Sequence, residues 1–347
     1  MARAKRLGVG VIGTGWVAGA HIDTFKQIDG CEIVAVCSRD KTRAEAKIHE
    51  HGLLGAVAYD DLKAFLKHPD MDIVTICTPH PQHPAETIAC ANAGKHIVIE
   101  KPLASNRKDL AKMVAAVNKA KVLTSVCFEL RWIGSIKNTK VLLEYGIVGR
   151  PFYGEASYFH GIGPWYKQWA WNIKKDVGWS SLLTAGCHAL DTLIYLMDSP
   201  VTEVSAMESI SKGNPLKYEY APNTVAIMKF ANGAIGKVAS SIECRQPYLF
   251  PVLIQGERGS IWNNQFSSTN YPGQKGWATM PAGMPDSGDV SDHPYKDQMA
   301  YFVECIKAGR APHNDIHSAA HVHEVMYAAE QSIRTGKTIK VPQTPGT

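Results

Sequence analysis

The sequence predicts an α/β protein, with a doubly wound parallel sheet at the amino end and an α+β domain after it. Three observations predict this architecture. A short apolar strand runs directly into the glycine turn Gly13-Thr14-Gly15 and then into a helix. Apolar strands and helical segments alternate from there to about residue 127. Beyond that point strand patterns follow one another, and Asn232-Gly233 joins two of them as a hairpin, which predicts a large, mostly antiparallel sheet.

The glycine turn has the pattern of a dinucleotide site. Gly13-Thr14-Gly15-Trp16-Val17-Ala18 reads G-x-G-x-x-A between a strand over residues 7–12 and a helix that reaches about residue 27. Gly13 allows the tight turn, Gly15 lets the backbone approach a pyrophosphate, and Ala18 permits close contact between helix and strand. The phosphates would bind the free N–H groups of the helix. We therefore expect residues 1–127 to form a Rossmann domain that binds NAD or NADP through Gly13, Thr14, Gly15, Trp16 and Val17.

The end of the second strand, residues 32–37, bears on the choice of cofactor. A site for NAD normally places a carboxylate here, on the ribose 2′-hydroxyl. Ser38 stands at this position and Arg39 follows, which leaves room for a 2′-phosphate and supplies a guanidinium to pair with it. We favour NADP over NAD for this reason. The alternative is that Arg39 stacks on the adenine or faces solvent while Asp40 holds the ribose.

Two motifs follow later strands of the parallel sheet, at the edge where such sheets bind ligands. Thr78-Pro79 ends the strand at residues 73–78, and Glu100-Lys101-Pro102 ends the strand at residues 96–100. Lys101 precedes proline, so its backbone is kept out of the helical region and its direction is defined. Its ammonium could stabilise the alkoxide that forms when a secondary alcohol is oxidised. We expect Lys101 to contact cofactor and substrate, Glu100 to pack or pair beneath it, and Thr78 and Pro79 to line the cofactor.

The composition is that of a folded protein of two domains. The chain has 347 residues, of which 45% are hydrophobic, and its net charge of +5 is spread along the sequence, which excludes a nucleic-acid-binding arm. No apolar run approaches the roughly 20 residues of a membrane span, and no signal-peptide pattern precedes the first strand. The eight cysteines are scattered and form no C-x-x-C pair, which indicates buried thiols. We expect a cytoplasmic protein.

Residues 128–347 predict a second domain for substrate binding and oligomerisation. Strand patterns cover residues 152–160, 201–208, 224–230, 235–242 and 249–255. Residues 265–297 are rich in Gly, Pro, Ser and Asn and predict a long surface loop, and helices are expected at 295–308 and 318–334. One face of the antiparallel sheet should be solvated or covered by a partner.

A helix predicted over residues 181–197 carries a candidate acid–base. Thr184, His188 and Asp191 share one face of it. Imidazole titrates near neutral pH, so His188 could take or return the proton of a substrate hydroxyl, with Thr184 and Asp191 tuning it. The alternative is a core histidine bonded to a backbone carbonyl.

Aromatic residues crowd the segment from 160 to 179, which is broken by glycine and predicts a loop beside the site. Indole rings suit the C–H faces of pyranoses, so we assign Trp165 and Trp171 to the substrate, with Asn172 and Lys174 bonding hydroxyl or acidic groups. The alternative is that several of the indoles belong to the core.

Four histidines gather near the carboxyl end, at positions 313, 317, 321 and 323. His317 and His321 have the i, i+4 spacing of a helical zinc site. No nearby residue completes a ligand set except Asp315 and Glu324. We therefore predict no metal site and assign these histidines to a solvated helix face.

In order and spacing these motifs resemble the family of glucose–fructose oxidoreductase, inositol dehydrogenase and MocA (Gfo/Idh/MocA). The resemblance covers essentially the whole chain and rests on Gly13-Thr14-Gly15 with His21, Thr78-Pro79 with His83, Ala93-Gly94-Lys95-His96 leading into Glu100-Lys101-Pro102, and the segment 186–191. It implies an NAD(P)-dependent oxidoreductase of sugars, glycosides or cyclitols. It also implies that His83 lies near the cofactor and Arg131 near the substrate, that the Lys101–Pro102 bond is cis, and that copies pair as a homodimer or homotetramer through the carboxy-terminal sheet.

The family also contains two other kinds of protein, which remain alternatives. One is a glycosidase that uses a tightly bound nicotinamide for transient oxidation and elimination. The other is a non-catalytic sensor of sugars or dinucleotides.

The chain departs from the family pattern in two places. The family often reads Asp-x-Gly-x-His where this chain has Thr184-Ala185-Gly186-Cys187-His188, and His80 stands where asparagine commonly follows Thr-Pro. A hydroxyl cannot stabilise an imidazolium as a carboxylate does, so we expect His188 to be less basic than in relatives with the aspartate. We expect the Lys101 ammonium and the His188 imidazole to meet at the nicotinamide ring. The motifs leave open which sugar and carbon react and in which direction.

Overall fold

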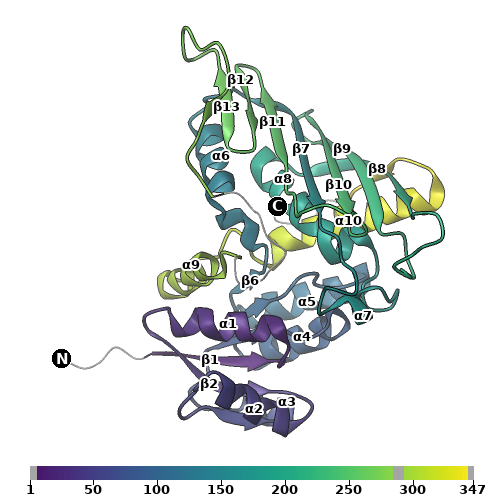
Figure 1. Cartoon of the computed structure of the whole chain (residues 1–347). Coiled ribbons are helices and arrows are strands. Elements are labelled where there is room, and N and C mark those ends of the chain that lie inside the picture. Colours follow the sequence, from purple (N-terminus) through teal and green to yellow (C-terminus); the bar gives the residue numbers. More distant parts are fainter. Residues whose placement is uncertain (1–5, 284–292, 343–347) are drawn as a thin grey trace. The chain divides into compact units, whose positions relative to one another are not determined.

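The computed structural model describes residues 6–283 and 293–342, and the chain divides into two compact units (Figure 1). The first unit comprises the residues up to 127 together with 294–319. The second comprises residues 128–293 together with those from 320 on. The segment 294–319, which the division at residue 127 placed in the second domain, therefore belongs to the first unit, where its helix packs against the helix that follows the glycine turn.

The sheet of the first unit is parallel throughout, with strand order β3-β2-β1-β4-β5-β6. Its strands are β1 (Leu7–Ile12), β2 (Cys31–Cys37), β3 (Val57–Tyr59), β4 (Ile73–Ile76), β5 (His96–Ile99) and β6 (Thr124–Val126). Strand order reverses direction between β1 and β4, which makes this the doubly wound order that binds dinucleotides. The predicted Rossmann sheet is confirmed.

Helices pack with these strands, and three of the six described in this unit begin at a capping side chain. They are α1 (Trp16–Lys26), α2 (Lys41–Glu50), α3 (Leu62–Leu66), α4 (His83–Asn92), α5 (Arg107–Ala120) and α9 (Tyr295–Ala308), with a 3-10 turn η1 over His80–Gln82. Asp40, Asp61 and Asn106 each accept a hydrogen bond from a backbone N–H in the first turn of α2, α3 and α5. Helix α1 differs, because its N-cap is Gly15 and has no side chain to offer.

The second unit is built on a sheet of nine strands, in the order β14-β13-β12-β11-β7-β10-β9-β8-β15. β7 pairs with β10 in parallel, and the other pairs are antiparallel. The strands are β7 (Pro151–Phe159), β8 (Val201–Ser209), β9 (Asn223–Phe230), β10 (Ile235–Ser241), β11 (Val252–Gly256), β12 (Gly259–Trp262), β13 (Gln265–Ser268), β14 (Ala278–Thr279) and β15 (Ile339–Lys340). The large, mostly antiparallel sheet is thus confirmed, and the Asn-Gly turn joins β9 to β10 with Gly233 at φ +88°.

One face of this sheet is covered and the other is open. The helical elements are η2 (Glu129–Trp132), α6 (Gly134–Glu144), α7 (Trp169–Asn172), the π-helical turn η3 (Leu182–Gly186), α8 (Cys187–Met197) and α10 (Ile316–Thr335), which belongs to this unit from residue 320 on. Helix α8 packs against β7 and β10 (Figure 1). Along β9, residues alternate between buried and exposed, so the described residues leave one face of this strand uncovered.

Three expectations were wrong in detail. The helix predicted over residues 181–197 begins with a π-helical turn, η3, and becomes α-helical only at Cys187. The predicted loop 265–297 contains β13, β14 and the start of α9, while its residues 284–292 lie outside the described part of the chain. The histidine cluster is not a solvated face, because His321 and His323 are buried and Nε2 of His321 accepts a hydrogen bond from the Val201 N–H at 2.9 Å.

All eight cysteines lie in the described part of the chain and are free thiols. Burial raises the pKa of several of them, including Cys31 to about 11 and Cys37 to about 12. Among the described residues, no helix combines the length and the hydropathy needed to cross a bilayer.

Candidate active site

The glycine turn forms an open cradle at the start of α1. Gly13 adopts φ +106°, and a Cβ there would stand 2.7 Å from the Cys77 carbonyl oxygen, so this position requires glycine. A Cβ on the exposed Gly15 would meet no heavy atom within 4 Å. The first turn of α1 carries neither a capping side chain nor an acidic residue. Backbone N–H groups at an uncapped helix start bind phosphate, so this cradle fits the pyrophosphate of a dinucleotide.

Ser38, Arg39 and Asp40 follow β2. One of them caps a helix and another presents an exposed guanidinium. The Asp40 carboxylate accepts the Thr42 N–H at 2.9 Å and so caps α2. Ser38 is half-buried, and its N–H donates to the Tyr59 carbonyl at 3.0 Å. Arg39 is exposed. Arg39 is thus exposed next to the half-buried Ser38, whereas Asp40 caps α2.

His83 joins the two strand ends that carry the predicted motifs. Its Nδ1 lies 2.8 Å from the Pro102 carbonyl oxygen and its Nε2 lies 2.8 Å from the Thr78 carbonyl oxygen. Burial lowers the pKa of His83, while its bonds to the Pro102 and Thr78 carbonyls act in the opposite direction. The Thr78 hydroxyl donates to Glu86 at 2.5 Å, and burial raises the pKa of that carboxyl to about 7. His83 and Thr78 therefore shape the loops after β4 and β5.

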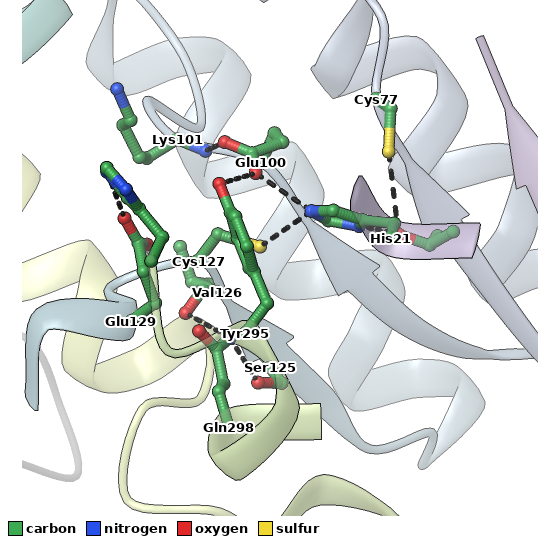
Figure 2. A network of polar contacts seen from close by, with 12 residues as sticks. His21, Cys77, Glu100, Lys101, Ser125, Val126, Cys127, Glu129, Tyr295 and Gln298 are labelled. Carbon is green, nitrogen blue, oxygen red and sulfur yellow. Dashed lines mark hydrogen bonds and ion pairs between the residues drawn. The ribbon is translucent and has the colours of Figure 1, made fainter. Parts of the chain in front are cut away.

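Glu100 is the centre of a buried hydrogen-bond network that carries Lys101 (Figure 2). Its Oε1 accepts from Nε2 of His21 at 3.1 Å and from the Tyr295 hydroxyl at 3.2 Å, and its Oε2 accepts from the Lys101 backbone N–H at 3.2 Å. The Lys101 side chain extends away from this network in Figure 2. The Lys101–Pro102 bond is cis, as the resemblance implies. Glu100 thus fixes the backbone of Lys101, while the side chain of Lys101 extends away from the network.

The charges of this network are fixed over a wide pH range. Burial raises the pKa of the Glu100 carboxyl, but the hydrogen bond and charge of His21 and the charge of Lys101 outweigh burial and bring the pKa down to about 2. Burial lowers the pKa of His21, whereas Cys77 and Glu100 raise it to about 10. The pair is therefore an imidazolium and a carboxylate, with Nδ1 of His21 donating to the Thr75 hydroxyl at 2.6 Å.

The same network brings three potential metal ligands together. One ligand atom each from His21, Glu100 and Cys127 lies within 4.8 Å of the others. His21 and Glu100 already bond one another, and Tyr295 and Thr75 bond the same pair. We therefore assign this group to an ion pair that supports Lys101.

In the second unit, His188 lies near the start of α8 in an aromatic and acidic setting. The Tyr158 ring stacks on it at 5.8 Å between centroids, and the Phe128 ring meets it edge-on at 6.1 Å. Its Nε2 lies 3.8 Å from Oε1 of Glu129, and Nε2 of His293 lies 3.5 Å from the same oxygen. The imidazole of His188 is 2% exposed. It is thus a buried histidine beside a buried carboxylate.

The polar residues expected to tune His188 make other bonds. Asp191 accepts two bonds from Arg131, at 2.8 Å from Nε and 2.5 Å from a terminal nitrogen. Burial raises the pKa of Asp191 above its usual value, and the Arg131 guanidinium opposes this only in part. The Thr184 hydroxyl donates to the Asn172 side-chain oxygen at 2.6 Å. Arg131 and Asp191 thus tie η2 to α8, and Thr184 ties η3 to α7.

The predicted substrate residues differ in how accessible they are. Trp165 is 58% exposed, its indole N–H donates to the Gly161 carbonyl at 2.9 Å, and Arg245 lies over its ring. Trp171 is half-buried in α7, and Lys174 forms an exposed ion pair with Glu219 at 2.6 Å. Asn172 is 5% exposed and binds Tyr220 through its carbonyl as well as Thr184. Trp165, Trp171 and Lys174 can meet a ligand from the surface, whereas Arg131 and Asn172 are bound within the fold.

Sequence reasoning did not find Glu129, His293 or Tyr295. Glu129 had a local signal, because it is an acid inside the apolar stretch from Cys127 to Leu130. Tyr295 and His293 had none, since their partners lie far away in the sequence. Lys101 belongs to the first unit and His188 to the second.

Comparison with known proteins assigns both units to one family. The model of an oxidoreductase family with an NAD-binding Rossmann fold, GFO_IDH_MocA, matches residues 7–128, and the GFO/IDH/MocA C-terminal domain matches residues 136–262. Similar curated proteins include a myo-inositol 2-dehydrogenase of Thermotoga maritima, 24% identical over 97% of this chain and 99% of its own length. A D-apiose dehydrogenase of Paraburkholderia graminis is 26% identical over 97% of this chain and 90% of its own length.

Solved structures share the fold. A levoglucosan dehydrogenase in complex with NADH superposes with a TM-score of 0.88, covering 98% of this chain and 100% of its own at 21% identity. The two family models together match most of the chain and assign the family. The chain belongs to the Gfo/Idh/MocA family of NAD-binding oxidoreductases.

Proposed function

We propose that this oxidoreductase interconverts a secondary hydroxyl and a carbonyl on a sugar, glycoside or cyclitol. The observation that carries the proposal is the Glu100 network, which fixes Lys101 by its backbone at the ligand-binding edge of a parallel sheet that also bears the open glycine cradle. The names of the relatives support the substrate class, since they include dehydrogenases of inositol and of apiose.

The cofactor would be held by the first unit. Gly13, Thr14, Gly15, Trp16 and Val17 would take the pyrophosphate, and the loops that carry Thr78, Pro79, His83 and Glu100 would lie along the rest of the molecule. The nicotinamide supplies the two-electron acceptor for the alcohol carbon. Lys101 donates to the reacting oxygen and stabilises its negative charge as the proton leaves. His188 accepts that proton during oxidation and returns it during reduction.

The remaining site residues position Lys101 or His188, or contact the substrate. Asp191 and Thr184 hold α8 and η3 by their bonds to Arg131 and Asn172, and so position His188. We assign Trp165, Trp171 and Lys174 to the substrate because they are exposed or half-exposed. We propose that Arg131 and Asn172, which are 4% and 5% exposed, contribute to the substrate site from within the fold.

Cofactor preference depends on Ser38 and Arg39. We propose that the ribose site accepts NADP at least as well as NAD, because Ser38 adds no negative charge and Asp40 is occupied as a helix cap. The NAD-binding family and the NADH complex of levoglucosan dehydrogenase favour NAD instead. The ratio of kcat/KM for the two cofactors decides this. A ratio that strongly favours NAD in the native enzyme would contradict the proposal, and Ser38→Asp should lower the use of NADP at least tenfold.

The experiment that tests the function is a panel of pyranosides and inositols assayed with each nicotinamide, for the native enzyme and for Lys101→Met. We expect net reduction of the nicotinamide by at least one polyol, and a loss of turnover of about 10²–10⁴-fold in the variant, with cofactor affinity almost unchanged. Lys175→Met is the control, because Lys175 is exposed. Cleavage of a glycoside without net reduction would indicate the glycosidase. Binding of both ligands without any exchange would indicate the sensor.

A second copy of the chain is the partner that we propose for the open face of the nine-stranded sheet. Met207 on β8 lies opposite Val225 on β9, and Ile227 and Ile235 are exposed on the same sheet. An apolar surface of this kind on a sheet face marks an interface. Light scattering of Ile227→Lys against the native protein tests it: we expect a homodimer or homotetramer that the substitution dissociates, and a native monomer would contradict the proposal.

We further propose that the protein works in the cytoplasm. The free thiols of all eight cysteines suit a reducing compartment. Cell fractionation with an antibody against the protein tests this location.

A further inference from the structure

The family often supplies the acid–base histidine with an aspartate four residues before it, and this chain has Thr184 there. A carboxylate nevertheless lies beside His188, and it comes from a different element. Glu129 is the first residue of η2, and its Oε1 stands 3.8 Å from Nε2 of His188, with side chains that are 1% and 2% exposed. We propose that Glu129 is the positioning carboxylate of His188 and takes the place of that aspartate. The inference rests on the acid–base role proposed for His188.

The burial of Glu129 supports this pairing. A carboxylate removed from water is costly unless a cation or hydrogen-bond donors compensate it. Two imidazoles face Oε1 of Glu129, that of His188 at 3.8 Å and that of His293 at 3.5 Å. A proton held on either ring would balance the carboxylate. The arrangement therefore keeps a mobile proton next to the residue that exchanges one with the substrate.

The fold holds Glu129 in place through its neighbour Arg131. Both residues belong to η2, and Arg131 makes two hydrogen bonds to Asp191 on α8, the helix of His188. A bidentate bond of this kind fixes both distance and orientation. The ion pair between Arg131 and Asp191 thus clamps η2 to α8 at the level where Glu129 meets His188.

Other ionisable groups also lie around His188, and the two phenols among them keep a constant charge near neutral pH. Burial raises the pKa of Tyr158, which stacks on His188, and that of Tyr248, so both phenols stay neutral. Asp191 is bound to Arg131, and Cys187 precedes His188 in α8 as a free thiol. His160 lies beyond Tyr158, 6.1 Å from it between ring centroids. Within the described residues, Glu129 and His293 are thus the groups whose charge we expect to act on His188.

The sign of the effect follows from the charge. An anion within about 4–6 Å favours the protonated form of an imidazole, so Glu129 raises the pKa of His188. This reverses the expectation of a weakly basic histidine, which considered Thr184 alone. A more basic His188 takes the substrate proton more readily during oxidation.

The test compares pH profiles of kcat/KM for polyol oxidation. In Glu129→Gln we expect the apparent pKa of the low-pH limb, where a protonated His188 can no longer accept the substrate proton, to fall by at least one unit, which is a tenfold change in proton affinity. Glu129→Asp should show a smaller fall. Adding Thr184→Asp to Glu129→Gln should move the limb back toward the native position. The matched control is Glu330→Gln, a half-buried carboxylate of the same unit, which should leave the limb in place.

Histidine NMR supplies a readout that does not depend on activity. The His188 signal in protein labelled with ¹³C-histidine is assigned by its loss in His188→Gln, and its titration is followed in the native protein. We expect a midpoint above the ordinary value of about 6.5 that falls in Glu129→Gln or, if that variant does not fold, in Glu129→Asp. A native midpoint at or below 6.5, or one that neither variant moves, would overturn the inference. A shifted midpoint in a protein without oxidoreductase activity would reject the proposed function and leave the pairing intact.

Discussion

Glu100 and Glu129 are both buried carboxylates beside histidines, yet their surroundings differ. Glu100 accepts three hydrogen bonds at 3.1–3.2 Å, from His21, Tyr295 and the Lys101 backbone. Glu129 faces His188 and His293 at 3.8 and 3.5 Å, which are distances of an ion pair rather than of a hydrogen bond. The first carboxylate is an anchor whose charge is fixed, and we infer that the second acts on a group that titrates.

The difference teaches how burial can serve two purposes. Burial raises the pKa of Glu100, but the hydrogen bond and charge of His21 and the charge of Lys101 bring it down to about 2, so its charge does not change in the pH range where the enzyme would work. A lysine that is held by such an anchor keeps its position at all those pH values. Glu129 has partners that are themselves able to gain or lose a proton, so its influence on His188 changes with pH.

The largest effect should come from breaking the anchor. Glu100→Gln leaves the buried His21 cation without its counter-charge, and we expect a loss of about 4–5 kcal/mol in the free energy of unfolding. Thermal unfolding followed by calorimetry measures it, with Glu257→Gln, an exposed surface carboxylate, as control. An unchanged melting temperature would show that Glu100 is not the anchor. Because the pKa of Glu100 is lowered, its stabilisation should be present above about pH 4.5 and lost as the pH falls toward 2.

Asp191, in its ion pair with Arg131, is a third buried carboxylate. It sharpens the comparison because it joins η2 to α8 and does not act on a reacting group. Arg131→Lys keeps the charge but loses the bidentate geometry, and we expect a loss of about 3 kcal/mol. Because η2 also carries Glu129, Arg131→Lys should lower turnover and at the same time shift the pH dependence of kcat/KM. A variant as stable as the native protein would argue against the clamp.

Glu86 should behave in the opposite way to Glu100. Burial raises the pKa of Glu86 to about 7, so its favourable contribution is present below about pH 4.5 and is lost as the pH rises through 7. Glu86→Gln should therefore make the protein more stable by about 2 kcal/mol at pH 8 and should change little at pH 4.5. Melting temperatures at the two pH values check this, and equal shifts at both would contradict it.

The smallest effect should come from the Tyr295 hydroxyl. Tyr295→Phe removes one of three donors to Glu100, and the other two remain, so we expect a loss of about 1 kcal/mol and nearly native turnover. Calorimetry and steady-state kinetics check it. A collapse of turnover would mean that Tyr295 contributes more to placing Lys101 than its single bond suggests.

What the sequence could predict depended on how local the signal was. The glycine cradle and the Glu100-Lys101-Pro102 motif are continuous segments whose chemistry follows from their order, and the structure places both at strand ends. Glu129 meets His188 only because η2 packs against α8, and Tyr295 reaches Glu100 from a helix near the other end of the chain. The π-helical turn at Leu182–Gly186 also had no signal, since its residues fit an ordinary helix. Contacts between distant segments depend on packing that periodicity does not encode.

The most direct test of the proposed activity follows the hydrogen at the reacting carbon. A polyol that the panel identifies as substrate is deuterated at its carbinol carbons and incubated with the native enzyme and oxidised nicotinamide, and the reduced cofactor is analysed by mass spectrometry. Dehydrogenation predicts one deuterium in each reduced nicotinamide, and none above background with Lys101→Met. Unlabelled cofactor, or deuterium lost to water while a glycoside is cleaved, would contradict the account.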